Sequence, residues 1–161
     1  MLLTNILFDI NNLNFEFPSF AADTWHTNCF KKSARKFAMA EGEKKVLIID
    51  PDPKDRRDLA QYLRNENYYI ETGKNLSEAI KKISEGCFNC LVMDINLPEM
   101  RGYDAIPIIK NLDSRLKVIM TTKKNTKKLE AKVREHDIFF YFIKSFGKDE
   151  LKLAIKNAFN P

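Results

Sequence analysis

Short continuous apolar runs alternate along the chain with segments in which apolar residues recur every three or four positions. A run such as Val46-Leu47-Ile48-Ile49 predicts a strand buried on both faces, and the periodic segments predict helices. The expected strands cover residues 46–49, 68–72, 90–93, 117–121 and 141–143. The expected helices begin at Pro53 and then cover residues 76–83, 102–112, 126–135 and 148–159.

This alternation predicts an α/β fold, because strands separated by helices build βαβ units and a parallel sheet. Right-handed crossovers restrict the topology further. We expect a doubly wound, five-stranded parallel sheet in the order 2-1-3-4-5. Within it, Pro107 lies past the first turn of the helix expected at residues 102–112 and should kink that helix.

Residues 1–43 differ from the rest, since their apolar clusters follow no sustained period. We expect an N-terminal extension of unknown role at residues 1–43 and one domain at residues 44–161. Asn5 and Asp9 interrupt the apolar start, which argues against a signal peptide. No apolar run is long enough to cross a membrane, and 3 cysteines are too few for a secreted disulfide framework. We therefore expect a cytoplasmic protein.

A polar residue capable of chemistry stands at the end of four expected strands, namely Asp50, Asp94, Thr122 and Lys144. In the order 2-1-3-4-5 the carboxyl ends share one edge, and the switch point lies between strands 1 and 3. Asp50 and Asp94 should therefore face each other. Two close carboxylates repel, and Mg²⁺ relieves such repulsion. With the ammonium of Lys144 and the hydroxyl of Thr122, this set suits phosphoryl transfer to an aspartate.

Four segments resemble the response-regulator receiver domains of two-component signalling, including the chemotaxis regulators. They read VLIIDPDP at residues 46–53, LVMDINLPEMRG at 91–102, VIMTT at 118–122 and YFIK at 141–144. They occur in the family's order and at its spacing, and the match covers about three quarters of the chain. Any one segment is a weak signal, whereas the set of four is specific.

The resemblance implies a flavodoxin-like receiver fold and a role for each matching residue. Asp94 is then the phosphoacceptor, and Mg²⁺ is held by Asp50, by Asp94 and by the backbone carbonyl of Asn96. Lys144 is implied to bond the phosphoryl oxygens. The residues implied to respond to phosphorylation are Thr122, which moves toward the phosphoryl group, and Tyr141, which changes rotamer.

The chain departs from the family pattern at four places. Pro51 stands where the family has a second acidic residue that binds the metal directly, and Asp52, one step later, should point elsewhere. We therefore expect weakened Mg²⁺ binding. Ser145 replaces the proline that usually follows the lysine, and Lys123 replaces a small residue. Residues 138–140 are apolar where the family turn is polar.

We expect a single-domain response regulator of a phosphorelay, phosphorylated on Asp94 by a histidine kinase or a phosphotransfer protein. It would be a phosphoprotein rather than an enzyme, with at most self-directed phosphoryl transfer and dephosphorylation. A downstream protein or a second copy would bind the face formed by the fourth and fifth expected helices, at residues 126–135 and 148–159, and the fifth strand, at residues 141–143. The alternative is a phosphorylation-independent pseudo-receiver binding module, which Pro51 and Ser145 favour.

Two further patterns have simple structural explanations that require no ligand. The net charge of +5 and the lysine-rich residues 123–134 are compatible with nucleic-acid binding, but such a run is more often a solvated helix face. Cys87 and Cys90 have the spacing of a redox or zinc motif, yet Cys90 begins a core strand. We therefore expect neither nucleic acid nor zinc as a partner.

Overall fold

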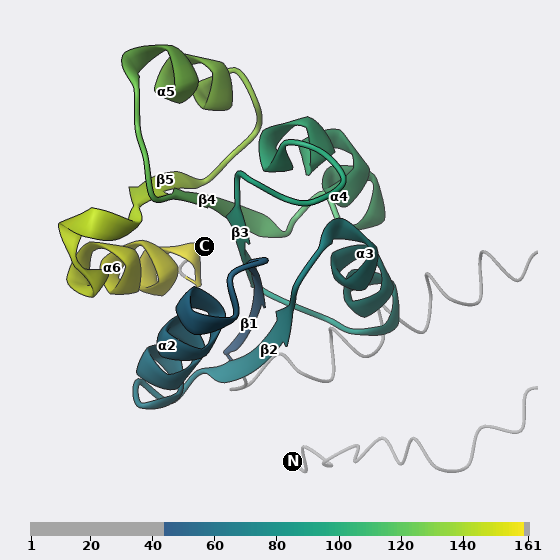
Figure 1. The fold of residues 1–161 in the computed structure, drawn as a ribbon. Helices are drawn as coiled ribbons and strands as arrows, with labels where there is room; N and C mark the ends of the chain where they lie inside the picture. The colour runs from purple at the N-terminus through teal and green to yellow at the C-terminus, as the bar shows by residue number, and fades with distance from the viewer. Residues whose placement is uncertain (1–43, 160–161) are drawn as a thin grey trace, which may run out of the picture.

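The computed structural model describes residues 44–159, which form a five-stranded parallel sheet with helices on both faces (Figure 1). The strands are β1 (Lys45–Ile49), β2 (Tyr69–Gly73), β3 (Cys90–Asp94), β4 (Lys117–Thr122) and β5 (Phe140–Ile143). The helices are α2 (Pro53–Arg64), α3 (Leu76–Glu85), α4 (Ile106–Leu112), α5 (Lys127–Arg134) and α6 (Lys148–Ala158). Two short 3₁₀ helices are η1 (Gly102–Ala105) and η2 (Lys144–Phe146).

The strand order β2-β1-β3-β4-β5 confirms the predicted doubly wound topology. The extension expected at residues 1–43 lies outside the described residues. No helix within residues 44–159 has the length and apolar character needed to span a membrane.

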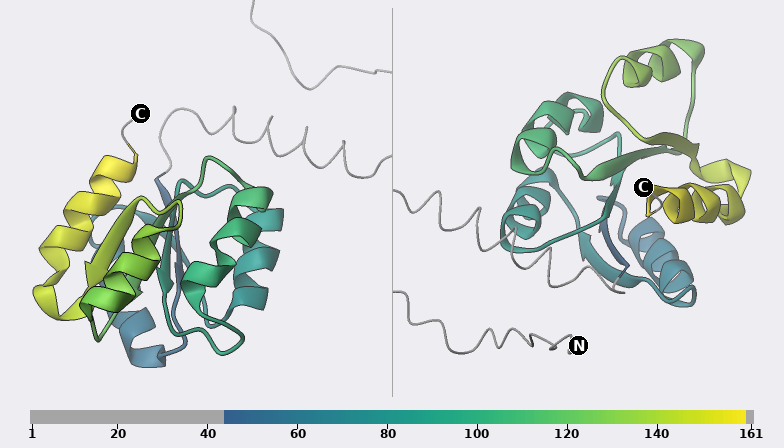
Figure 2. Two further views of the ribbon diagram at one scale, coloured as in Figure 1. Left: turned by 90° about the horizontal axis from the view of Figure 1, so that it is seen from above. Right: turned by 180° about the vertical axis from the view of Figure 1, so that it is seen from behind.

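Two apolar layers hold the sheet between its helices. In β1, Leu47 and Ile49 pack under α3, α4 and α5, whereas Val46 and Ile48 pack under α2 and α6. The two views in Figure 2 show these helix layers on opposite sides of the sheet. Because both faces are covered, the central strands are apolar at every position rather than at alternate positions.

Polar side chains fix the start of three helices. Asp52 accepts hydrogen bonds from the backbone N–H groups of Lys54 (2.9 Å) and Asp55 (3.2 Å) and so caps α2. Asn75 caps α3 and Thr126 caps α5 in the same way. Such caps satisfy N–H groups that have no partner within the helix. The cap of α2 places Asp52 and Asp55 beside the carboxyl end of β1.

The helix expected at residues 102–112 is divided in the structure. It starts as η1, and α-helical geometry begins only at Ile106, so Pro107 lies in the first turn of α4. A first-turn proline leaves no intrahelical hydrogen bond unmade. The expected mid-helix kink is therefore wrong, because the helix starts later than its apolar pattern indicates.

Of the apolar residues 138–140, at the start of β5, two pack against the core. Ile138 and Phe140 pack against the two apolar layers. Phe139 is 38% exposed, with the ammonium of Lys117 5.5 Å from the centre of its ring.

Candidate functional site

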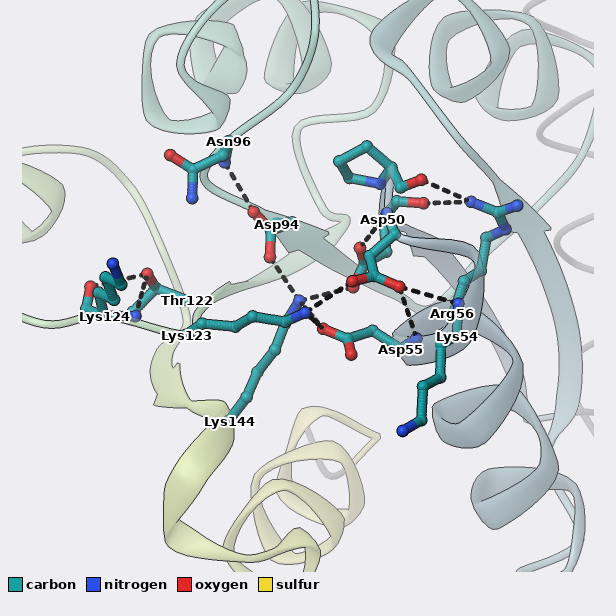
Figure 3. Close-up of polar contacts among 12 residues, drawn as sticks. Asp50, Lys54, Asp55, Arg56, Asp94, Asn96, Thr122, Lys123, Lys124 and Lys144 are labelled. Carbon is teal, nitrogen blue, oxygen red and sulfur yellow. Dashed lines mark hydrogen bonds and ion pairs between the residues drawn. The ribbon is translucent and has the colours of Figure 1, made fainter.

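The carboxyl ends of β1, β3, β4 and β5 bring together the four residues that the sequence singles out. Asp50 directly follows β1, Asp94 ends β3, Thr122 ends β4 and Lys144 directly follows β5. The parallel pairing sets Ile49 beside Met93 and so places Asp50 next to Asp94. Asp50 and Asp94 are 2% and 5% exposed, so both carboxylates are buried at the sheet edge (Figure 3).

Lys144 joins the two buried carboxylates. Its Nζ lies 2.6 Å from Oδ2 of Asp50 and 2.5 Å from Oδ2 of Asp94. Asp55, in the first turn of α2, accepts a third hydrogen bond from the same ammonium at 3.0 Å. The structure therefore brings together Asp50, Asp94 and Lys144, and Asp55 is a further member of the cluster. Sequence reasoning missed Asp55, because an acidic residue in a first helical turn is explained by the helix dipole alone.

The charges at this edge perturb one another. Burial raises the pKa of Asp50, and repulsion from Asp94 adds to this effect against the opposing influence of Lys144. Burial by itself would lower the pKa of Lys144, but its hydrogen bonds to Asp50 and Asp94 outweigh burial and raise that pKa. Lys144 is therefore positively charged over the whole physiological range.

The loop after β3 orients Asp94. The backbone N–H of Asn96 donates to Oδ1 of Asp94 at 2.7 Å, which leaves Oδ2 for Lys144. The side chain of Asn96 accepts from Arg101, and the two residues form an antiparallel bridge that closes the loop. At Gly102 a Cβ atom would lie 2.5 Å from the backbone oxygen of Asp94, so the loop needs glycine there for steric reasons.

Lys123 crosses the site from β4 to α2. Its Nζ lies 2.6 Å from Oδ2 of Asp52 and 3.0 Å from Oδ2 of Asp55. The hydrogen bond from Lys123, together with the backbone donors of α2, lowers the pKa of Asp52 to about 2. The contacts of the Asp52 carboxylate are thus with the first turn of α2 and with Lys123. The partners of Lys123 were not predicted, because the presence of a lysine in place of a small residue does not indicate which carboxylates it contacts.

Thr122 and Tyr141 are tied to the loop between β4 and α5. The buried hydroxyl of Thr122 donates to the backbone oxygen of Lys124 at 2.9 Å. The hydroxyl of Tyr141 donates to Oδ1 of Asn125 at 2.8 Å, and its ring is 7% exposed. Thr122 and Tyr141, the two residues implied to respond to phosphorylation, thus contact the same loop. The hydroxyl of Thr122 bonds to this loop and not to Asp94.

The donor chemistry of the site fits a small divalent cation. Four carboxylates (Asp50, Asp52, Asp55, Asp94) meet two ammonium groups (Lys123, Lys144), which leaves an excess of negative charge. Asp50 and Asp94, with the backbone carbonyl of Asn96, offer the hard oxygen ligands that Mg²⁺ takes. Pro51 adds no side-chain ligand, and residues 44–159 contain no cluster of three ligating side chains.

Comparison with known proteins gives consistent matches. The family model of the response regulator receiver domain matches residues 46–156. The transcriptional regulatory protein ResD of Bacillus subtilis (strain 168) is 30% identical over 116 residues, which cover 71% of this chain and 47% of ResD. The chain spans about half the length of such curated relatives, or less. For the DNA-binding transcriptional regulator NtrC of Azospirillum brasilense, the match covers 24% of that protein.

Two solved structures illustrate the structural likeness. The response regulator TrrA from Thermotoga maritima, in complex with Mg²⁺–BeF, has a TM-score of 0.64 and 30% identity, covering 71% of this chain and 98% of that chain. The beryllofluoride-activated NtrC4 receiver domain dimer has a TM-score of 0.67 and 30% identity, covering 71% and 95%. These matches cover the described domain and leave residues 1–43 unmatched by the family model.

Proposed function

Because the chain belongs to the response regulator receiver domain family, we propose that a histidine kinase or a phosphotransfer protein phosphorylates it on Asp94. The observation that carries this proposal is the buried pair of Asp50 and Asp94, joined by Lys144 at 2.6 and 2.5 Å. We assign the role of nucleophile to Asp94 because it ends β3 within residues 91–102, the segment that resembles the phosphoacceptor segment of the family.

The proposed transfer follows the geometry of these groups. An oxygen of Asp94 attacks phosphorus while the bond from phosphorus to the donor breaks, and the electrons of that bond leave with the donor. Lys144 is placed to donate hydrogen bonds to the phosphoryl oxygens as they approach Asp94. Mg²⁺, when bound to Asp50, Asp94 and the Asn96 carbonyl, supplies charge neutralisation for those oxygens. The aspartyl phosphate is the signal, and we propose no turnover of any other substrate.

The proposed output is a change in protein contacts at the surface formed by α5, β5 and α6. Thr122 ends β4, the strand beside β3, and its hydroxyl bonds to the loop that also contacts Tyr141, so a shift of this hydroxyl toward a phosphoryl group on Asp94 breaks its bond to that loop. This supports transmission toward α5 and β5. A second copy is the proposed partner, in keeping with the NtrC4 receiver domain, which is a dimer.

Intact-mass spectrometry after incubation with acetyl phosphate and Mg²⁺ tests the assignment of Asp94. The wild-type chain should gain the mass of one phosphoryl group slowly, and Asp94→Asn should gain none. If the wild type and Asp94→Asn gain the same mass, phosphorylation occurs elsewhere and the assignment is wrong.

We predict that Pro51→Asp accelerates phosphorylation at millimolar Mg²⁺, because it restores a carboxylate beside Asp50 and Mg²⁺ tolerates an incomplete ligand set poorly. The effect should be about tenfold or more in the initial rate, since one charged ligand contributes on the order of 1.4 kcal/mol or more. A wild type that remains unmodified while Pro51→Asp is modified would support the pseudo-receiver alternative. If neither chain is modified, phosphorylation is not the function of this site.

A further inference from the structure

Lys123 belongs to a continuous chain of ion pairs that reaches the phosphoacceptor. Its ammonium and that of Lys144 both lie 3.0 Å from the same atom, Oδ2 of Asp55. Lys144 in turn contacts Asp94, so one carboxylate oxygen separates Lys123 from the group that contacts the reaction centre. Figure 3 shows the side chains of Lys123 and Lys144 reaching this point from β4 and β5.

The position of Lys123 is determined at both ends. At its own end, the hydroxyl of Thr122 and the backbone of Lys124 hydrogen-bond reciprocally and fix the turn after β4. At the other end, Asp52 is held by its role as the cap of α2. The side chain of Lys123 is 54% exposed and that of Lys144 is 16% exposed. Lys123 therefore lies at the mouth of the site and Lys144 lies inside it.

Two sequence departures change the charge of this site in the same direction. Pro51 removes a negative charge that the family pattern has, and Lys123 adds a positive charge where that pattern has a small residue. A positive charge at the mouth opposes a second cation at Asp50 and Asp94, and it attracts the oxygens of a phosphoryl group. The same ammonium therefore disfavours Mg²⁺ and favours the anion.

We propose that Lys123 is a tethered cation that competes with the divalent ion and takes over part of its charge-neutralising role. This inference rests on the proposed phosphorylation of Asp94. In the unphosphorylated chain Lys123 is held by Asp52 and Asp55. When a phosphoryl group is present, Lys123 exchanges these carboxylates for phosphoryl oxygens by changing its side-chain rotamer, and Asp52 remains the cap of α2.

Calorimetric titration with Mg²⁺ alone tests the competition without any phosphorylation. Lys123→Met should bind Mg²⁺ about three- to tenfold more tightly than the wild type, the effect of removing one unit charge a few ångströms away. Lys124→Met is the matched control, because Lys124 is the adjacent exposed lysine and makes no ion pair within residues 44–159. It should change the affinity by less than about twofold. Equal effects of the two variants, or no binding to either, would overturn the proposal.

Phosphorylation by acetyl phosphate in excess chelator tests the second half of the proposal. The wild type and Lys123→Arg should still gain phosphoryl mass, while Lys123→Met should be slowed about tenfold or more. Saturating Mg²⁺ should largely abolish this difference, whereas a purely structural ion pair between β4 and α2 would slow the variant equally with and without Mg²⁺. If the wild type is unmodified under both conditions, the proposed function fails, and the Mg²⁺ titration alone decides the role of Lys123.

Discussion

At the scale of the residue, the folded domain disfavours the ionised form of the buried carboxyl group of Asp50. Its Oδ1 accepts the backbone N–H of Asp52 and its Oδ2 accepts from Lys144, yet burial and the neighbouring Asp94 still raise its pKa. A folded-state pKa above the unfolded value means that folding favours the protonated form. The ionised carboxylate therefore lowers the stability of the folded domain at neutral pH, and this penalty disappears as the pH falls below the unfolded value.

We predict that Asp50→Asn stabilises the domain at pH 7, by about 1 kcal/mol, because the amide removes the buried charge beside Asp94 while its single oxygen keeps one of the two hydrogen bonds. The gain should diminish as the pH is lowered into the acidic range, because the wild-type carboxyl group becomes protonated there and loses its charge. Urea unfolding followed by circular dichroism at several pH values measures this difference. Asp58→Asn, at an exposed residue of α2, is the control and should show little effect. A stability loss in Asp50→Asn at pH 7 would contradict the assigned penalty.

The same residues show which part of the site the sequence determines. Asp50, Asp94 and Lys144 could be predicted, because each follows a buried apolar run and parallel strands bring such positions to one edge. The contacts of Asp55 and Lys123 could not be predicted in this way, since Asp55 lies in α2 and the partners of Lys123 depend on the rotamer of a long side chain that reaches from the end of β4 to α2. Backbone periodicity predicts which edge a residue occupies, and long polar side chains then select their partners in three dimensions.

At the scale of the element, the loop between β4 and α5 is held by three side-chain contacts within five residues. Thr122 bonds to Lys124, Asn125 accepts from Tyr141, and Thr126 caps α5. Of the side chains of α5, Val133 is fully buried and Leu129 packs partly buried against the core. The contact between Asn125 and Tyr141 joins the loop to β5, and the bond of Thr122 is the one that a change at Asp94 would release.

We predict that Tyr141→Phe lowers the free energy of unfolding by about 0.5–1.5 kcal/mol, the usual net value of one hydrogen bond. Asn125→Ala should lower it by at least as much, because Asn125 also donates to Glu130. Because the two residues share that bond, the double variant should lose less than the sum of the two single variants. A double-mutant cycle by urea unfolding measures the coupling. Additive losses would mean that the hydroxyl of Tyr141 does not depend on Asn125 in solution.

The elements themselves show why sequence analysis succeeded for strands and failed at one helix. The strands were predicted within one or two residues, because both faces of the sheet are covered and each strand is a continuous apolar run. The segment at 102–112 has the apolar residues of one helix but is a 3₁₀ turn followed by α4. Apolar spacing alone does not distinguish these two geometries, and the close approach of Gly102 to Asp94 that shapes this turn is a tertiary contact.

At the scale of the whole molecule, three of the six large apolar side chains that are exposed within residues 44–159 lie in the C-terminal part of the domain, and the other three are Tyr69, Met100 and Ile108. Phe139 before β5, Phe146 in η2 and Leu153 on α6 are 38%, 68% and 59% exposed. Tyr69, which is 51% exposed, lies on β2 at the opposite edge of the sheet. Exposed apolar residues that gather on one part of a surface mark a contact site more often than isolated ones do. Phe146 and Leu153 follow the carboxyl end of β5 and lie beside or on elements of the proposed contact surface, whereas Phe139 lies at the other end of β5.

If a second copy binds there, Leu153→Glu should weaken the phosphorylation-dependent dimer by about tenfold or more, because an interface cannot bury an unpaired carboxylate without a large desolvation penalty. Multi-angle light scattering after treatment with beryllofluoride and Mg²⁺ measures the mass of the complex over a range of protein concentrations. Tyr69→Glu places the same charge at an exposed apolar position on the far edge and should leave the dimer unchanged. Equal weakening by both variants would indicate a general effect of charge, and loss of the dimer in Tyr69→Glu alone would move the contact to the β2 edge. Because the hydroxyl of Thr122 bonds to the loop that leads into α5, a change at Asp94 that breaks this bond would alter the same surface.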